Sequence, residues 1–115
     1  MKKTLTVLIA AGALLGAAGC SASPQLTNAE TCARVKTVVS AQSATSDQAG
    51  MARVANQLRP IKAVASDDLK GPLQTIIEYF DESAKPNPDT TKLEAMKADY
   101  TAAGQSYGKI CGSGQ

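Results

Sequence analysis

The sequence has no histidine and no tryptophan, and its aromatic side chains are limited to three tyrosines and one phenylalanine. Histidine is the side chain that most often exchanges protons near neutral pH and binds metal ions, so its absence removes the usual acid–base and metal-site chemistry. Nucleophile–base pairs of the Ser–His and Cys–His kind are excluded as well. Catalysis would depend on Asp, Glu, Lys and Tyr alone, and we therefore expect a non-enzymatic protein.

The acidic residues and glycines also lack the patterns that carry chemistry. Adjacent acids occur only at Asp67-Asp68 and Asp81-Glu82. Neighbours on a helix point in different directions, so neither pair shares a proton readily. No D-x-D-x-D calcium loop is present, and the scattered glycines form no phosphate-binding loop. We expect no metal site and no cofactor.

The N-terminus has a strong composition pattern. Lys2 and Lys3 precede a run of uncharged, mostly apolar residues over 5–18. That run has the length of the apolar region of a secretory signal and is short for a membrane span. It ends in Ala17-Ala18-Gly19-Cys20, which resembles a bacterial lipobox, although the family prefers leucine where this chain has Ala17.

The lipobox resemblance implies where the chain is held. It implies cleavage of a signal peptide, residues 1–19, and a diacylglycerol on the Cys20 thiol, which becomes the mature N-terminus. Two acyl chains hold a protein firmly on a membrane. The expected location is extracytoplasmic and lipid-anchored to the cell membrane. The alternative is an ordinary cleaved signal with an unmodified Cys20, which would give a soluble secreted protein.

Cleavage after residue 19 would leave a small, electrically balanced chain. Removing residues 1–19 of 115 leaves 96 residues, the size of one domain. Ten of the 12 Lys and Arg then remain, against ten Asp and Glu. This balance gives no reason to expect nucleic acid as a partner or a polybasic patch on the membrane.

Apolar residues at spacings of three and four predict four helices and no strand. Residues 20–26 are expected to form the lipidated Cys and a tether, residues 27–112 the helical domain, and residues 113–115 a flexible tail. The clearest stripe is in the third helix, with Phe80 near its middle, and we expect Phe80 to be among the most buried side chains. The predicted stripes are Ala29, Cys32, Val35 and Val39; Met51, Val54, Ala55, Leu58, Ile61 and Ala65; Leu69, Leu73, Ile76, Ile77, Phe80 and Ala84; and Leu93, Met96, Tyr100, Ala103, Tyr107 and Ile110.

Capping residues and prolines indicate where these helices begin and end. Capping boxes are predicted at Thr27–Glu30 and Thr91–Glu94, where a hydroxyl and a carboxylate can each accept an amide hydrogen. Pro60 predicts a kink or a short break in the second helix. The third helix is expected to begin at Ser66-Asp67-Asp68 or, alternatively, at Pro72.

Two cysteines remain if Cys20 is lipidated. Cys32 lies near the start of the first helix and Cys111 at the end of the fourth. In an up-down-up-down four-helix bundle these positions lie at the same end. An oxidising compartment favours a disulfide between them, and a domain with so few aromatic side chains needs such a covalent link. The alternative is two free, buried cysteines.

The tyrosines are the candidate contact residues. Tyr100 and Tyr107 lie on the apolar face of the fourth helix, where they pack in the core or, alternatively, line a binding groove. Tyr79 lies beside the main stripe of the third helix and is a candidate for contact with a partner.

The lipobox at residues 17–20 and the Cys32/Cys111 pair together give the chain a broader resemblance. It resembles small, secreted or lipid-anchored actinobacterial proteins with a short helical domain and a cysteine near each end. Members of that group are mostly without known activity, so the resemblance implies no functional residues. We expect a non-enzymatic cell-envelope protein that binds or spaces something at the membrane surface. The alternative is an inhibitor or immunity-type partner of another protein.

Overall fold

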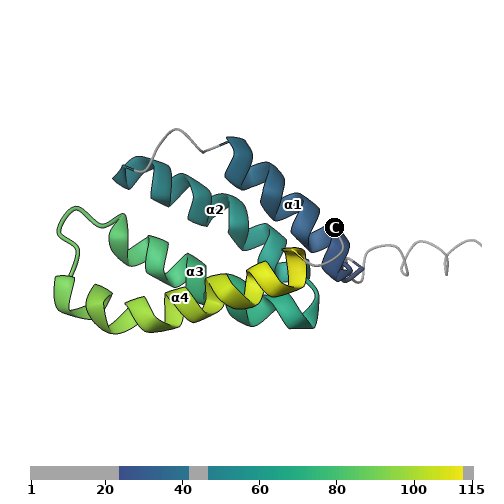
Figure 1. The fold of residues 1–115 in the computed structure, drawn as a ribbon. Helices are drawn as coiled ribbons and strands as arrows, with labels where there is room; N and C mark the ends of the chain where they lie inside the picture. The colour runs from purple at the N-terminus through teal and green to yellow at the C-terminus, as the bar shows by residue number, and fades with distance from the viewer. Residues whose placement is uncertain (1–23, 42–46, 113–115) are drawn as a thin grey trace, which may run out of the picture.

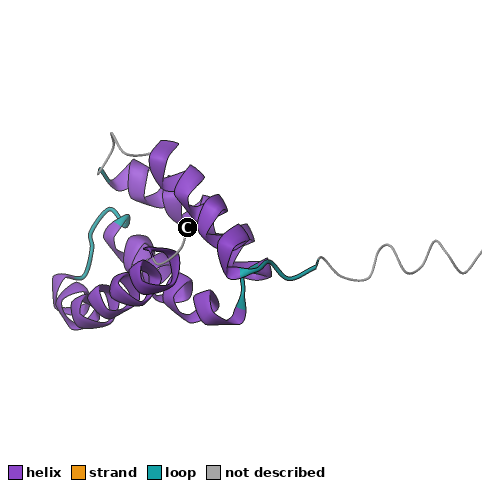
Figure 2. Ribbon diagram, turned by 45° about the vertical axis from the view of Figure 1, so that its right-hand side comes forward, coloured by secondary structure: helices purple, strands orange, loops and turns teal. Residues whose placement is uncertain are grey.

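The computed structural model describes residues 24–41 and 47–112, and within these ranges all regular structure is helical (Figure 2). This confirms the all-α prediction. The predicted signal peptide, Cys20 and the tail over 113–115 lie outside the described residues. The helices are α1 (Asn28–Ala41), α2 (Gln48–Val64), α3 (Asp67–Ser83) and α4 (Thr90–Gly112).

The helices follow one another in an up-down-up-down bundle (Figure 1). α3 packs closely against both α2 and α4, whereas α1 lies mainly on α2 and makes few contacts with α3 and α4. The start of α1 and the end of α4 lie at the same end of the bundle. The predicted order and direction of the helices are therefore confirmed.

The core is small and aliphatic. Leu58, Leu69 and Leu73 are its largest fully buried side chains. Ala103 of α4 is also buried, although most of the apolar face of α4 is only half-buried. The main buried cluster consists of Cys32, Val35, Ala55, Leu58, Ile61, Ala65, Leu69, Leu73 and Ile77.

Two expectations about this core are wrong. Phe80 is half-buried and packs against the edge of the cluster, because the shorter Leu69, Leu73 and Ile77 occupy its centre. Val39 on α1 is 53% exposed, because α1 covers the bundle chiefly with its first half.

A disulfide joins Cys32 to Cys111, as predicted, with their Cα atoms 5.5 Å apart and a sequence separation of 79. It connects α1 to α4, which otherwise share few contacts. In the chain-entropy description, closing a loop of this length stabilises the folded state by roughly 4.5 kcal/mol.

The first capping box is present as predicted. The amide of Glu30 donates to Thr27 Oγ1 at 3.1 Å, and the amide of Thr27 donates to Glu30 Oε2 at 2.9 Å. The Thr27 backbone bond lowers the pKa of Glu30. At α2 the cap is Asp47, whose carboxylate accepts the amide of Gly50 at 2.8 Å.

The second capping box, predicted at Thr91 and Glu94, is wrong. α4 begins two residues earlier because Asp89 caps it, accepting the amide of Lys92 at 3.1 Å. The backbone amide of Asp89 is itself held by Glu82 Oε1 at 3.2 Å, so the preceding helix positions this cap.

The prolines do not interrupt the helices. α2 continues through Pro60 to its end, which excludes the predicted break. α3 begins at Asp67 and contains Pro72, so Pro72 is not its first residue. Ser66 occupies the cap position, but its hydroxyl makes no cap bond, and its amide instead donates to Thr31 Oγ1 at 3.2 Å.

The segment before α1 is hydrogen-bonded to the corner between α2 and α3. The Leu26 amide donates to the carbonyl of Val64 at 2.7 Å, and Gln25 Nε2 donates to Asp67 Oδ1 at 2.8 Å. Asn28 Nδ2 adds a bond to Asp68 at 3.2 Å. The tether was predicted to extend through Leu26, but its last two residues lie against the domain.

A buried carboxylate holds the turn between α3 and α4. The side chain of Glu82 is 4% exposed and lies 2.7 Å from Lys85 Nζ and 3.0 Å from Lys92 Nζ. These two lysines, together with the Asp89 amide, lower the pKa of Glu82 to about 2. The residues between the helices, 84–89, are therefore fixed to the end of α3 by charge-assisted bonds.

We expect Cys32→Ala and Cys111→Ala each to lower the free energy of unfolding by about 2–5 kcal/mol, because the unfolded chain regains the freedom that the disulfide removed. Urea unfolding with and without reductant measures this loss. The oxidised wild-type protein should show no free thiol for this pair, and two reactive thiols in the native protein would contradict the pairing.

We expect Glu82→Gln to destabilise the protein at neutral pH and to change its acid sensitivity. Since the folded state lowers the pKa of Glu82 from 4.5 to about 2, its contribution is complete above about pH 4.5 and is lost as the pH falls through about 2. Urea unfolding at pH 7, 4 and 2 should show the difference from wild type shrinking toward pH 2. The exposed Glu94→Gln is the matched control, and an equal effect there would contradict this role.

Candidate functional site

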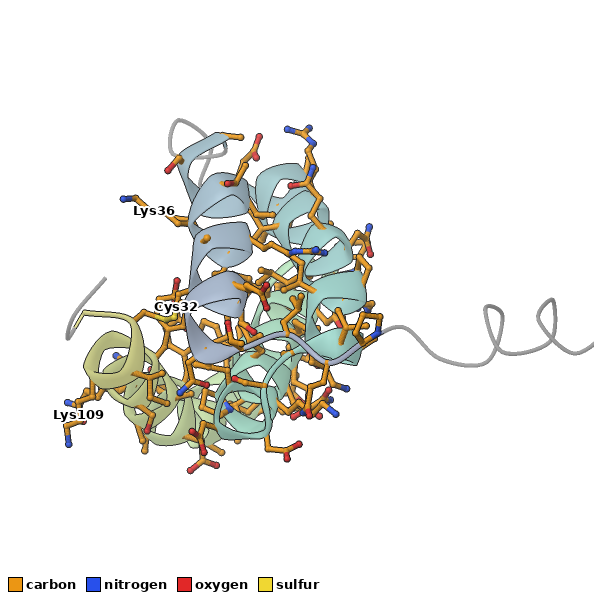
Figure 3. All side chains as sticks on the ribbon, turned by 90° about the vertical axis from the view of Figure 1, so that its right-hand side faces the viewer. Cys32, Lys36 and Lys109 are labelled. Atoms are coloured by element: carbon orange, nitrogen blue, oxygen red, sulfur yellow. A yellow bond between two sulfur atoms is a disulfide. The ribbon has the colours of Figure 1, made fainter. Side chains whose placement is uncertain are left out.

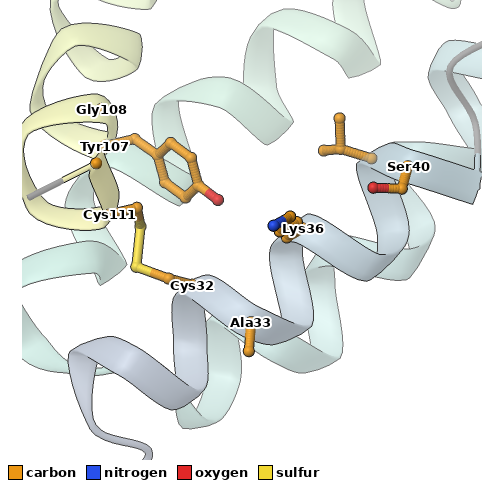
Figure 4. A pocket seen from close by; sticks show the side chains of 9 residues that line it. Cys32, Ala33, Lys36, Ser40, Tyr107, Gly108 and Cys111 are labelled. Carbon is orange, nitrogen blue, oxygen red and sulfur yellow. A yellow bond between two sulfur atoms is a disulfide. The ribbon is translucent and has the colours of Figure 1, made fainter. Parts of the chain in front are cut away.

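A pocket of about 530 Å³ opens between α1 and α4, next to the disulfide (Figure 4). The lining comes from one face of α1 and from the last turns of α4. It consists of Cys32, Ala33, Lys36, Val39, Ser40, Tyr107, Gly108, Cys111 and Gly112.

The pocket exists because the two helices meet closely only at the disulfide. The Cys32–Cys111 bond brings their backbones to 5.5 Å. The α4 side of the lining has glycine at positions 108 and 112, and α1 lines the opposite side with Lys36 and Val39. Without side chains on those two glycines, the space between the helices stays open.

The polar groups of the pocket are few and lie on both sides of the opening. Figure 4 shows the ring of Tyr107 projecting from α4 with its hydroxyl toward the part of α1 that carries Lys36. The Tyr107 hydroxyl is protonated at neutral pH, as in any tyrosine, and burial raises its pKa further, so it is available as a hydrogen-bond donor. Within the described part of the chain, Lys36 has no hydrogen-bond or ion-pair partner.

The charged side chain of the pocket lining is positive. Residues 31–41 and 100–112 contain Arg34, Lys36 and Lys109 but no Asp or Glu. In the end-on view of Figure 3, Lys36 and Lys109 extend from the same side of the molecule, with Cys32 between them. Arg34 lies outside the lining and interacts with Glu30, so Lys36 is the cation of the pocket itself.

The candidate tyrosines have separate roles. Tyr107 lines the pocket, in agreement with the groove alternative. Tyr100 packs away from it, with its ring stacked on Tyr79 at a centroid distance of 4.2 Å and tilted against Phe80 at 5.9 Å. Tyr79 is half-buried by this contact between α3 and α4, so much of its surface is used within the fold.

Sequence reasoning missed three residues of the pocket lining, which are Lys36, Val39 and Ser40. Val39 was placed in the core, and a lone lysine on a helix is usually solvated. The sequence did hold one indication of this site. Residues 31–41 and 100–112, which the Cys32–Cys111 disulfide brings together, contain no Asp or Glu.

No group of three or more His, Cys, Asp or Glu residues that suits a metal ion occurs within residues 24–41 and 47–112. Across the same ranges, none of the helices combines the length and the apolar character that crossing a membrane requires. Comparison with family models, with curated proteins and with solved structures finds no match for the chain.

Gly108 lies in the pocket lining, and substituting it tests whether the space beside it is open. A Cβ atom added at Gly108 would meet no heavy atom within 4 Å, and the same holds at Gly104, outside the pocket lining. Since alanine favours a helix over glycine, Gly108→Ala and Gly104→Ala should each raise the free energy of unfolding by about 0.5–1 kcal/mol in urea titrations. A loss of stability in Gly108→Ala alone would mean that the space beside it is already filled.

Proposed function

We propose that this protein is a lipid-anchored, non-enzymatic binding module of the cell envelope, and that the pocket between α1 and α4 is its binding site. The observation that carries the proposal is the pocket's position beside the disulfide, where α1 begins. The chain enters the domain at this end. A ligand in the pocket would therefore sit close to the proposed anchor.

The length of the linking segment supports a short distance between anchor and domain. Cys20 precedes Pro24 by four residues, which span no more than about 14 Å when extended. From Gln25 onward the chain is hydrogen-bonded to the corner between α2 and α3, including a bond to the carbonyl of Ala65 at 3.1 Å. This anchorage favours a domain held near the membrane surface in a restricted range of orientations.

The absence of histidine supports a binding role over a catalytic one. The pocket lining holds one lysine, one serine and one tyrosine as its polar side chains. Among these there is no carboxylate or imidazole to accept a proton from Ser40 or Tyr107. Such a lining can orient a ligand, and its one side chain that could accept a proton is the exposed Lys36.

The anchor is tested by the mass and location of the mature protein. We expect a chain that starts at Cys20, carries the added mass of a diacylglycerol and partitions into the detergent phase. Cys20→Ser should be found in the medium or remain unprocessed, whereas Ser23→Ala, three residues away, should behave as wild type. An unmodified mature mass for the wild-type protein, together with its recovery from the medium, would replace the proposal by a soluble secreted protein.

A further inference from the structure

We propose that the pocket between α1 and α4 binds a single-chain anionic amphiphile, such as a long-chain fatty carboxylate. The head group would lie between Lys36 and Tyr107, and the hydrocarbon chain along the apolar lining. This inference rests on the proposed function only in taking the pocket as the binding site, and it names the ligand class. It does not require the lipid anchor.

The local charge selects an anion. Lys36 is the one charged side chain in the pocket lining, and it is exposed. The C-terminal carbonyls of α4 oppose its field with about half a negative charge. The full positive charge of Lys36 exceeds that contribution, so the field at the opening favours a negative ligand.

The polar groups suit a carboxylate in particular. Lys36 is exposed, and within the described residues its ammonium has no internal partner, so binding an anion requires no ion pair to break. The Tyr107 hydroxyl lies opposite it and, as a phenol that is protonated at neutral pH, can donate a hydrogen bond. A carboxylate accepts two such charge-assisted bonds on its two oxygens.

The rest of the lining suits a hydrocarbon chain. Ala33, Val39, the ring of Tyr107 and the Cys32–Cys111 sulfur atoms are apolar, and the glycines expose only backbone. A volume of about 530 Å³ is within the range of small-molecule sites, roughly 300–1,000 Å³. An inorganic anion would contact the polar rim alone and leave this apolar surface in water, whereas an amphiphile would cover it.

The exposed Val39 supports the same conclusion. It is the one large aliphatic side chain exposed to solvent in the described part of the chain, at 53%, and it lies in the pocket lining. Contact with a hydrocarbon chain would remove this surface from water. A fully polar ligand would gain nothing from it.

The test is photoaffinity labelling of the full-length protein in its own membranes with hexadecanoic acid that carries a diazirine at the end of its chain. After illumination, mass spectrometry locates the adducts. We expect adducts concentrated in the peptides that contain residues 32–40 and 107–112. Excess tetradecanoate should reduce this labelling at least five-fold, and tetradecanol, which lacks the charge, should reduce it less than two-fold.

Two pairs of variants separate the pocket from general contact with lipid. Gly108→Leu fills the open space beside the α4 wall and should lower pocket labelling at least five-fold, while Gly104→Leu, on the same helix outside the lining, should not. Lys36→Gln should weaken competition by tetradecanoate about ten-fold, while Lys97→Gln, an exposed lysine elsewhere on α4, should leave it unchanged. Circular dichroism of each variant confirms that it remains helical.

Equal labelling in Gly108→Leu and Gly104→Leu, or equal competition by tetradecanoate and tetradecanol, would overturn the proposal. Fractionation of the same cells reports on the anchor separately. Pocket labelling of a protein found in the medium would remove the proposed anchor and leave this inference standing. A membrane-bound protein without pocket labelling would overturn this inference and leave the proposed anchor standing.

Discussion

The link between Cys32 and Cys111 is the constraint on which the arrangement of this protein depends. The core consists mostly of alanine, valine, leucine and isoleucine, with no fully buried aromatic ring, so packing alone contributes modestly in so small a domain. α1 is the helix with the least packing against the other three. The disulfide restricts it in the unfolded and folded states alike and places its first turns on the end of α4.

Hydrogen bonds and ion pairs at the connections between helices stabilise parts of the fold that the small core packs only loosely. Thr31, which is fully buried, donates to the Thr27 carbonyl at 2.8 Å and accepts the Ser66 amide, which ties the start of α1 to the corner between α2 and α3. At the other end, Glu82 gathers Lys85, Lys92 and an amide around one buried carboxylate. The Glu82 bonds are charge-assisted and made by a buried carboxylate, and the Thr31 hydroxyl is buried and both donates and accepts, so these contacts are stronger than bonds exposed to water.

The same features account for the pocket. α1 and α4 are joined covalently at the disulfide, and beside it the positions of Gly108 and Gly112 have open space where a side chain would lie. The opening lies where the chain enters the domain, and the charged side chain in its lining is Lys36. The Cys32–Cys111 disulfide therefore bears both on the arrangement of the helices and on the pocket that we propose as the binding site.

The helices, their order and the disulfide could be predicted from the sequence, because apolar spacing, the Thr27 capping box and the cysteine positions agree with one another. Which part of each apolar stripe is buried depends instead on how the helices pack. Val39 lies beyond the part of α1 that covers the bundle, and shorter aliphatic side chains occupy the centre of the core in place of Phe80. The amide of Asp89, which caps α4, donates to Glu82 across the turn, and Lys36 faces Tyr107 because α1 packs beside α4. The local apolar pattern specifies neither contact.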